Sequence, residues 1–567
     1  MKFRIAFPFL SVTLLLPFLC YAQPWDPPIP PGEKEAYEKQ DDPYLPNAYN
    51  NEKLSPAYRY DGRSHSRTGA TEIFTRQVNV SQSQKNIMGD AANEPSIAVN
   101  PLNENEIVIG WRQFDNVSSN FRQAGYGYSS DGGQTWTFPG AIDPGVFHSD
   151  PVLDYDNAGN FYYNSLTSQF SGDYPCYVYK SGDAGVSWNN GVYIGGGDKQ
   201  WMTIDRSGGM GERNIYSSWD YNSSHCLPGF FTRSTDGAAS FDLCSNIIDK
   251  LSTGTQAVGN SGELYVCGQS SNAVVRVAKS IDAQDPAHSP SWTSVKTVNL
   301  GGTIVHFAQI NPGGISGQLL IDVDRSNGPG RDNVYVVASI KPYLSSDPVD
   351  VMFNKSTNAG MSWHNAPTKI NDDAAATNTQ WFATMSVAPN GRIDVIWLDT
   401  RDHPGSDRSA LYYSYSIDEG TTWSVNERLS DSFNPHIGYP NQDKMGDYFD
   451  MISNNAGVHL AWANTLNGEQ DVYYSFITPS IMTSMKDISE NANISVYPNP
   501  TSGLLEIDAA DKRIRIEIFM TDGKKILSTS VFDTRHVIDI SSQPAGIYFL
   551  KAIGEDRLVT VTKIIKM

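Results

Sequence analysis

Six ionisable side chains stand out as groups that could carry chemistry, because each lies beside an apolar stretch that predicts a β-strand. A carboxylic acid such as Asp150 or Asp198 could protonate a leaving group, and a histidine such as His148 could take up a proton. A pair of arginines could hold a ligand carboxylate through paired hydrogen bonds. The candidates for catalysis are Arg112, His148, Asp150, Asp198, Asp220 and Arg401.

A second set of polar and aromatic residues lies in the same loops and is predicted to contact a substrate. These residues are Trp111, Trp219, His225, His306, Asp399, His403 and Asp447. Acidic groups recur just before the strands, as in NEP, SDP, GDKQW and GDYF, which also place Glu94 and Lys199 there. The alternative is that each group caps a strand and binds water. The joint presence of histidine, arginine and carboxylates favours a site in these loops.

An octapeptide of the form Ser-x-Asp-x-Gly-x-Thr-Trp recurs at intervals of about 50 residues, which is typical of a repeat architecture. The copies are Ser129–Trp136, Ser181–Trp188, Ser234–Phe241, Ser356–Trp363 and Ser416–Trp423, and a sixth begins at Ser280 with an insertion that delays its aromatic residue to Trp292. The Asp carboxylate can accept backbone N–H bonds inside a tight turn, and glycine tolerates a positive φ. The tryptophan is placed to bury its ring between neighbouring sheets.

The octapeptide resembles the Asp-box, or BNR repeat, of sialidase-like β-propellers. The resemblance implies that the boxes are structural and lie away from any active site. The positions to which it assigns this structural role are Asp131, Trp136, Asp183, Trp188, Asp236, Asn358, Trp363, Asp418 and Trp423.

Residues 76–478 contain seven repeat units, one more than the octapeptides count. The seventh unit, Asp447–Ile477, lacks both the octapeptide and a fourth strand, and Gln77–Ser81 is predicted to supply that outer strand. The sequence therefore predicts an all-β chain built as a seven-bladed β-propeller, with six blades, the number in true sialidases, as the alternative. In this architecture the loops that precede each first strand and those that join strands two and three share one face. The octapeptides lie on the opposite face.

The N-terminal region and the charge limit the partners of the chain. Residues 1–22 combine basic residues with an apolar run and predict a secretion signal, and residues 23–75 predict an extended or disordered leader. The formal net charge of −20 argues against nucleic acid as a partner, and no later run predicts a transmembrane segment. Four cysteines permit two disulfides in three possible pairings: Cys176, Cys226, Cys244 and Cys267.

Residues 479–492 predict a linker, and residues 493–567 predict a small C-terminal β-sandwich. The segment contains Val496–Thr501 (VYPNPT), Ala545–Leu550 (AGIYFL) and a basic, apolar end at Lys563–Met567. These features, in this order, resemble the C-terminal sorting domain of the type IX secretion system. The resemblance implies that the secretion machinery is a partner and that the protein is released or held at the cell surface.

Three functions compete for the propeller. In a sialidase-like glycoside hydrolase, Arg112 and Arg401 would hold a sugar carboxylate, Asp150 or Asp198 would act as the acid, and a Tyr–Glu pair would supply the nucleophile. In a polysaccharide lyase, His148 or a tyrosine would abstract a proton from a uronic-acid polymer while an arginine neutralises the uronate. The third function is a non-catalytic surface module that binds glycans or proteins. The sequence favours a secreted carbohydrate-active protein directed at extracellular glycans.

No cofactor or metal is predicted. Asp322–Ser326 (DVDRS) begins like a calcium-binding loop, but Gly328 falls one place late and no acidic residue closes the loop. A parallel hairpin begins at Asp205, so an ordinary turn is the preferred interpretation of both segments.

Overall fold

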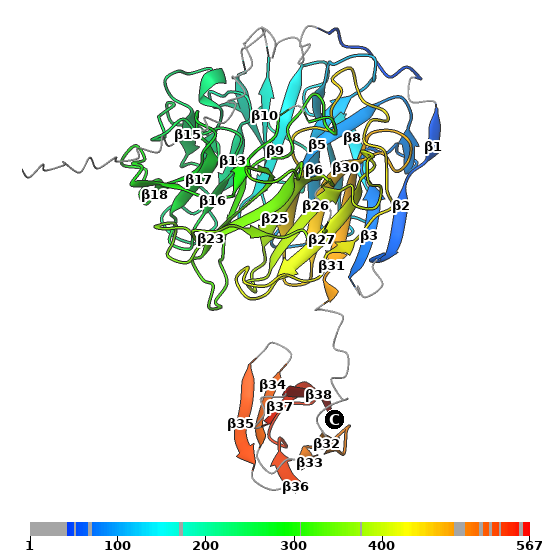
Figure 1. Cartoon of the computed structure of the whole chain (residues 1–567), viewed down its shortest axis with the longest axis vertical. Coiled ribbons are helices and arrows are strands. Elements are labelled where there is room, and N and C mark those ends of the chain that lie inside the picture. The colour runs from blue at the N-terminus through cyan, green and yellow to red at the C-terminus, as the bar shows by residue number, and fades with distance from the viewer. Residues whose placement is uncertain are drawn as a thin grey trace, which may run out of the picture.

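The computed structural model describes residues 42–49, 53–65, 71–168, 174–306, 308–374, 377–480, 494–509, 514–520, 524–531, 535–554 and 559–567. In this part the protein is all-β, and its one short 3-10 turn is η1 (Tyr221–Ser223) (Figure 1). None of the described residues forms a helix long and apolar enough to cross a membrane. The predicted secretion signal, residues 23–41 of the predicted leader and most of the predicted linker lie outside the described residues.

Antiparallel sheets follow one another along residues 72–478, and all but the last pair their main strands in chain order. The first four sheets are β5 (Ala91–Val99), β6 (Ile107–Phe114), β7 (Gln123–Ser129) and β8 (Thr137–Ala141); β9 (His148–Tyr155), β10 (Phe161–Thr167), β11 (Cys176–Ser181) and β12 (Val192–Tyr193); β13 (Trp201–Ile204), β14 (Ile215–Ser218) and β15 (Phe231–Ser234); and β16 (Gln256–Val258), β17 (Leu264–Gln269), β18 (Val275–Ser280) and β19 (Ser294–Thr297).

Three further sheets complete this region. They are β21 (Leu320–Val323), β22 (Val334–Pro342), β23 (Asp350–Ser356) and β24 (Thr368–Lys369), with β20 (Gly302–Thr303) paired to the far end of β22; β25 (Gln380–Val387), β26 (Ile393–Asp399), β27 (Ala410–Ser416) and β28 (Glu427–Arg428); and β29 (Asp450–Ser453), β30 (Val458–Asn464), β31 (Asp471–Thr478), β3 (Glu72–Gln77) and β2 (Arg59–Arg63).

The first strand of each sheet lies innermost. Every residue of β5 is buried, whereas β8 at the outer edge of the same sheet is largely part-exposed. Small and β-branched residues such as Ile97, Ala98 and Val99 fit this crowded position, because a strand covered on both faces favours continuous apolar sequence. The first strands of successive sheets contact one another, and β29 of the last sheet contacts β5 of the first.

Hydrogen bonds tie the neighbouring first strands together. In each case a short side chain on one strand accepts the backbone N–H of the next, which satisfies a donor that the sheet itself leaves unpaired. The pairs are Ser96 with Leu153 (2.8 Å), Asp154 with Ile204 (2.8 Å), Thr255 with Ile321 (3.0 Å), Asp322 with Val387 (2.8 Å), Ser386 with Ser453 (3.0 Å) and Asp450 with Ile97 (3.1 Å).

The last sheet joins the two ends of this region, as the blue β3 beside the orange β31 shows (Figure 1). The outer strand β3 spans Glu72–Gln77, so the prediction of Gln77–Ser81 is displaced by five residues. The physical reason is that Ile73 packs into the core together with Ile477, to which it is paired. The sheet gains a fifth strand, β2, and this protects the edge of β3.

The leader predicted to be extended or disordered contains β-strands where it is described. Strand β1 (Leu54–Pro56) pairs with β4 (Lys85–Ile87), and β2 also falls in this range. Farther upstream, Asp42 accepts hydrogen bonds from Asn120 N at 2.9 Å and from Asn441 Nδ2 at 3.1 Å. Contacts with distant parts of the chain thus order a segment whose composition gives no periodic signal.

The octapeptide turns connect the third and fourth strands and share one set of hydrogen bonds. In the first turn, Ser129 Oγ donates to Asp131 Oδ1 at 2.8 Å. Thr135 N donates to the same oxygen at 3.0 Å, and Thr135 Oγ1 donates to Asp131 Oδ2 at 2.6 Å. The same pattern recurs around Asp183, Asp236, Asn358 and Asp418. Despite its insertion, the copy at Asp282 accepts from Ser291 N at 2.8 Å.

The aromatic residue that ends a turn packs against the preceding sheet. The ring pairs are Trp136 with Tyr474 (5.5 Å), Trp188 with Tyr126 (5.8 Å), Trp292 with Phe231 (5.3 Å) and Trp423 with Phe353 (5.2 Å). Each turn therefore stabilises its own hairpin and also one seam between sheets.

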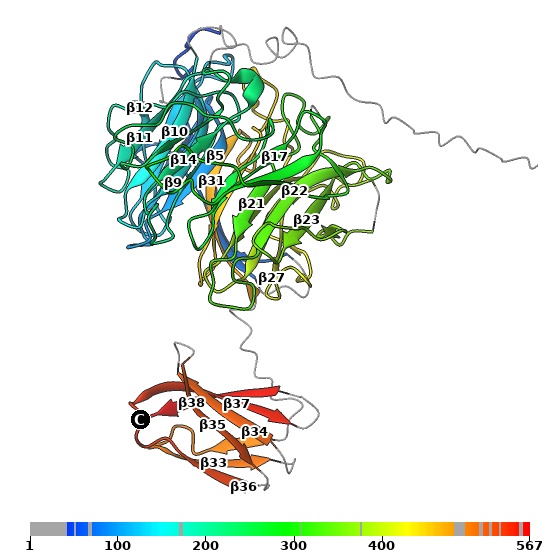
Figure 2. The same cartoon turned by 90° about the vertical axis from the view of Figure 1, so that its left-hand side faces the viewer.

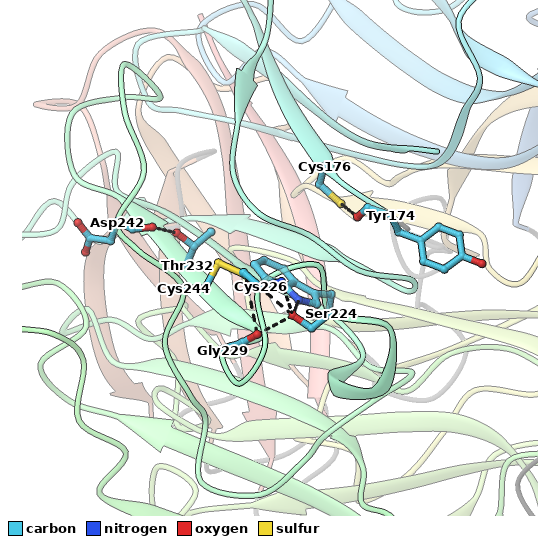
Figure 3. The surroundings of a disulfide bond; sticks show 9 residues. Tyr174, Cys176, Ser224, Cys226, Gly229, Thr232, Asp242 and Cys244 are labelled. Carbon is cyan, nitrogen blue, oxygen red and sulfur yellow. Dashed lines mark hydrogen bonds between the residues drawn. A yellow bond between two sulfur atoms is a disulfide. The ribbon is translucent and has the colours of Figure 1, made fainter. Parts of the chain in front are cut away.

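One disulfide forms among the four cysteines. Cys226 and Cys244 are bonded with their Cα atoms 6.3 Å apart, which ties the loop after β14 to the segment beside β15 (Figure 3). In that segment Thr232 Oγ1 donates to the carbonyl of Asp242 at 2.7 Å. Cys176 and Cys267 are buried, unbonded thiols, so the second disulfide that the sequence permits does not form.

The C-terminal module consists of two antiparallel sheets, drawn in orange to red (Figure 2). The sheets are β32 (Ile494–Tyr497), β33 (Leu504–Ala509) and β36 (Arg535–Asp539); and β35 (Lys525–Val531), β34 (Ile514–Met520), β37 (Gly546–Gly554) and β38 (Val559–Lys566). Alternating apolar residues from both sheets, such as Leu505, Ile518 and Leu550, form their common core.

Candidate functional site

Charged residues that lead into the first strands lie at one end of the sheets, which we call the strand-start end. Neighbouring strands are antiparallel, so the octapeptide turns after each third strand lie at the opposite end, the turn end. Three of the charged residues adopt a left-handed backbone: Glu94 (φ 50), Asp150 (φ 50) and Lys199 (φ 57). This conformation is unfavourable for side chains other than glycine and is concentrated at functional sites.

Seven charged side chains meet at the strand-start end, and we call them the charge cluster. Its ion pairs are Arg112 Nε–Glu94 Oε2 (3.1 Å), Lys444 Nζ–Glu94 Oε1 (3.2 Å), Lys444 Nζ–Asp447 Oδ2 (2.9 Å), Lys199 Nζ–Asp447 Oδ2 (2.7 Å), Lys199 Nζ–Asp198 Oδ1 (3.4 Å) and Lys199 Nζ–Asp150 Oδ2 (3.6 Å). The cluster joins the starts of the first three sheets to the segment that leads into the last.

The charge cluster is buried, and its acids therefore titrate unusually. Burial raises the pKa of Glu94 to about 7, against the opposing effect of the cations of Arg112 and Lys444. Burial would also raise the pKa of Asp447, but the ammonium groups of Lys199 and Lys444 hold it well below its ordinary value. Both Nη atoms of Arg112 are buried without a hydrogen-bond partner among the described residues. The cluster thus contains an acid that can hold a proton near neutrality, Glu94, beside an ionised carboxylate, Asp447.

A loop from another part of the chain covers the charge cluster. Residues 308–316 lie between β20 and β21, and Ile315 N donates to Asp447 Oδ1 at 3.1 Å. Asn311 fastens the loop, because its Nδ2 donates to the carbonyl of Gly446 at 2.9 Å and its Oδ1 accepts from Met445 N at 2.9 Å. A Cβ atom at Gly314 would lie 2.7 Å from Asp447 Oδ1, so the close approach requires glycine.

Four of the residues predicted from the sequence belong to the charge cluster: Arg112, Asp150, Asp198 and Asp447. Arg401 and Asp399 lie outside it and pair with each other at 2.8 Å, while Arg401 also holds Asp372 at 2.6 Å. The two predicted arginines therefore serve different carboxylates and form no common clamp.

His148 lies at the start of β9 but faces a separate group. Its Nε2 is 3.5 Å from Asp143 Oδ2, and the hydroxyl of Tyr179 donates to the same oxygen at 2.5 Å. The rings of His148 and Tyr179 meet edge to face at 6.1 Å. The contact with His148, together with the hydrogen bond from Tyr179, holds the pKa of Asp143 below its ordinary value.

The remaining predicted contacts are dispersed. Trp111 and Trp219 are buried in the core, with exposed fractions of 0% and 2%, so neither indole presents a surface to a substrate. Asp220 caps η1 by accepting from Asn222 N at 2.9 Å. The other three lie in loops: the ring of His225 meets that of Tyr193, His306 bridges to Ile315, and His403 N donates to the carbonyl of Thr400.

Sequence reasoning missed Lys444 and Asn311. Lys444 precedes Asp447 by three residues, and this proximity was the only signal that could have pointed to it. Asn311 has no such signal, because its role arises from a contact across 135 positions of sequence. Among the described residues, no group of three or more His, Cys, Asp or Glu side chains is arranged to hold a metal ion.

Comparisons with known proteins do not assign an activity to residues 72–478. No curated protein matches the chain. A crystal structure of a protein of unknown function from Dyadobacter fermentans is 13% identical with a TM-score of 0.42, covering 71% of this chain and 98% of that one. A Hadza microbial sialidase is 12% identical with a TM-score of 0.38, covering 69% and 66%. Likenesses this distant carry no argument about activity.

The C-terminal module gives a clear result. Residues 495–567 match the family model described as the secretion system C-terminal sorting domain. The match covers this module and leaves the large region unassigned. The protein is carried by type IX secretion to the cell surface or beyond it.

Proposed function

We propose that this secreted protein is a seven-bladed propeller that acts on extracellular glycans, and that it hydrolyses a glycosidic bond at the charge cluster. The seven sheets between residues 72 and 478 support the blade count, as do the contacts of their first strands. The hydrogen bond from Ile97 N to Asp450 supports closure between the last sheet and the first. In a propeller the starts of the innermost strands converge near the axis, where substrates bind.

The observation that carries the proposal is the protonation state of the Glu94 carboxyl group. Burial raises its pKa to about 7, so at neutral pH a substantial fraction of Glu94 is a protonated acid. Asp447, in the same cluster, is held ionised by two lysines. Glycoside hydrolysis requires such a pair: an acid that protonates the leaving oxygen, and a carboxylate that stabilises positive charge on the sugar or activates water.

In the proposed reaction Glu94 donates its proton to the glycosidic oxygen as the bond to the sugar carbon breaks. Asp447, the ionised carboxylate of the cluster, takes a proton from the water whose oxygen forms the new bond to the sugar carbon. Arg112 contributes its unpartnered Nη atoms as donors to substrate oxygens. Glu94 is fully buried, so a substrate can reach it only when the segments around it move aside.

The test is hydrolysis by the purified full-length chain, followed by the release of reducing ends from a panel of neutral and acidic glycans. Glu94→Gln keeps the size of the side chain and removes the acid, so turnover should fall by about 10²- to 10⁴-fold. Thr253→Val is the matched control, because Thr253 has the same left-handed backbone (φ 60) at a strand start outside the cluster. Unchanged turnover in Glu94→Gln, or no turnover on any glycan, would contradict the proposal.

A polysaccharide lyase is the second candidate, and the grouping of His148, Tyr179 and Asp143 favours it. A histidine beside a tyrosine could remove the proton next to a uronate carboxylate. This reaction leaves an unsaturated sugar whose ultraviolet absorbance can be followed. If His148→Gln abolishes that absorbance while Glu94→Gln does not, the lyase replaces the hydrolase. Saturable glycan binding without either product would instead identify a binding module.

A further inference from the structure

A polar pocket of about 190 Å³ lies at the turn end, between the second and third sheets. It is lined by Tyr162 and Lys180 of the second sheet, by Glu212 and Arg213 of the β13–β14 hairpin, and by Thr235, Asp236 and Gly237 of the octapeptide turn. Pockets for drug-sized ligands are larger, roughly 300 Å³ or more. The volume therefore suits one small polar group, such as a single charged substituent or a sugar.

The two cations that line this pocket are not neutralised. The Arg213 guanidinium has no hydrogen bond or ion pair with any residue that the structure describes. Lys180 Nζ donates to the carbonyl of Gly237 at 3.3 Å and lies 5.2 Å above the ring of Tyr162. Neither contact removes the positive charge, so both side chains can attract an anion.

The two acids of the pocket are already satisfied. Asp236 accepts hydrogen bonds from Ser240, from N at 2.9 Å and from Oγ at 2.6 Å, within its own turn. Glu212 accepts from Asn157 Nδ2 at 2.9 Å and from Gly208 N at 2.9 Å. These donors are neutral, so both acids keep their charge, but the hydrogen bonds hold their oxygens on partners other than Arg213 and Lys180.

The corresponding position between the fourth and fifth sheets repeats the lysine and tyrosine contacts of this pocket. There Lys279 Nζ donates to the carbonyl of Ala359 at 3.0 Å, and Tyr265 donates to the same oxygen at 3.2 Å. The residue that corresponds to Arg213 is Asp332, in the β21–β22 hairpin. Asp332 N donates to the carbonyl of Asp324 as Arg213 N donates to the carbonyl of Asp205, and both residues have a φ of 68. Asp332 is fixed by Asn260 Nδ2 at 2.7 Å.

This internal pair shows that the position does not require arginine for the fold. A left-handed backbone is better tolerated by aspartate than by arginine. Asp332 satisfies the local structure, whereas Arg213 makes no contact that would explain its presence. We propose that the pocket around Arg213 and Lys180 binds the carboxylate or sulfate group of an acidic ligand, through paired hydrogen bonds from the guanidinium and the charge of the ammonium.

The experiment measures equilibrium binding of sulfate, glucuronate and a sulfated polysaccharide to the full-length protein by calorimetry. Arg213→Asp copies the residue at the corresponding position, Asp332, and should weaken binding at least about 10-fold without loss of thermal stability. Asp332→Arg should create a second site and raise the stoichiometry from one to two. The small anions test the pocket itself, and the polysaccharide tests whether the anionic group is recognised on a glycan.

Two results would overturn the proposal: equal affinity of the wild-type protein and Arg213→Asp for all three probes, or no binding by the wild-type protein. Binding of sulfate and glucuronate alone would limit the ligand to small free anions. The pocket does not depend on the charge cluster, so Glu94→Gln should bind the probes as the wild-type protein does. Failure of the hydrolase proposal would therefore leave this one standing.

Discussion

The two ends of the seven sheets both concentrate aspartates, but they use them in opposite ways. At the turn end, burial alone would raise the pKa of Asp131 and Asp183. Hydrogen bonds from residues such as Thr135 and Ser187 outweigh this effect and hold both pKa values below the ordinary value. At the strand-start end, burial raises the pKa of Glu94 to about 7. The first arrangement favours a permanent anion, and the second favours an acid that exchanges its proton.

The difference is one of sequence distance. Every donor to Asp131 Oδ1 and Oδ2 comes from within the octapeptide itself. In contrast, Lys199 and Asp447, which meet at 2.7 Å, are 248 residues apart. A local carboxylate turn forms whenever its hairpin forms, whereas the charge cluster exists only when distant sheets are assembled. Stability at the turn end therefore depends on individual hairpins, whereas stability at the strand-start end depends on the assembly of several sheets.

Asp447→Asn should cause the largest loss of stability. The substitution leaves Lys199 and Lys444 with a neutral partner in a buried site, and removing one member of a buried ion pair costs about 3–5 kcal/mol. The measurement is the free energy of unfolding from denaturant titration. Asp372→Asn is the control, because its partner is also a cation, Arg401, but its side chain is 49% exposed. A loss of at most about 1 kcal/mol is expected there.

If Asp447→Asn is as mild as Asp372→Asn, the charge cluster does not stabilise the assembled sheets. In that case the burial of three cations would have to be compensated by contacts other than the ion pairs. The strand-start end and the turn end would then differ only in whether their carboxyl groups exchange a proton near neutral pH.

The free energy of unfolding should decrease on both sides of a maximum in pH, and we call the two sides the acid arm and the upper arm. Glu94 and Asp471 have pKa values raised to about 7 by burial, so the folded state keeps protons that the unfolded state releases above about pH 4. Stability should therefore fall as pH rises from about 4 to 7. The turn-end aspartates have lowered pKa values, and their contribution is lost as pH falls below about 4.

Denaturant titrations between acidic and mildly alkaline pH should place the stability maximum near pH 4, by these values. Glu94→Gln should flatten the arm above this maximum and leave the acid arm unchanged. A stability that rises steadily up to alkaline pH would show that the buried carboxylates are ionised in the folded protein, and would also remove the acid from the proposed hydrolase.

What the sequence could predict follows the same division. The octapeptides predict their turns because all their donors are local, and the acidic motifs before the strands predict Asp150 and Asp447. The sequence does not predict Lys444 or Asn311, since their roles depend on segments that meet only after assembly. For the same reason the outer strand β3 is misplaced by five residues, because its partner β31 lies at the far end of the region.

Asp183→Asn should have the smallest effect, because the chain already contains the substituted form. In the fifth sheet Asn358 occupies the aspartate position, its Oδ1 accepts from Ser362 N at 2.9 Å, and its Nδ2 donates to Ser362 Oγ at 2.8 Å. An amide thus satisfies the same turn with the direction of one hydrogen bond reversed. The expected loss is less than about 1 kcal/mol, whereas Asp183→Ala should lose about 1–2 kcal/mol, since it leaves turn donors unpaired.

The reciprocal variant Asn358→Asp sharpens this test, because it restores the carboxylate in a turn of unchanged shape. It should leave stability near neutral pH within about 1 kcal/mol of the wild-type value. It should also steepen the acid arm, since the chain gains a carboxylate that must be protonated there. If Asp183→Asn costs as much as Asp447→Asn, the turn-end carboxylates contribute through their charge. The contrast between a locally satisfied end and an assembled end would then fail.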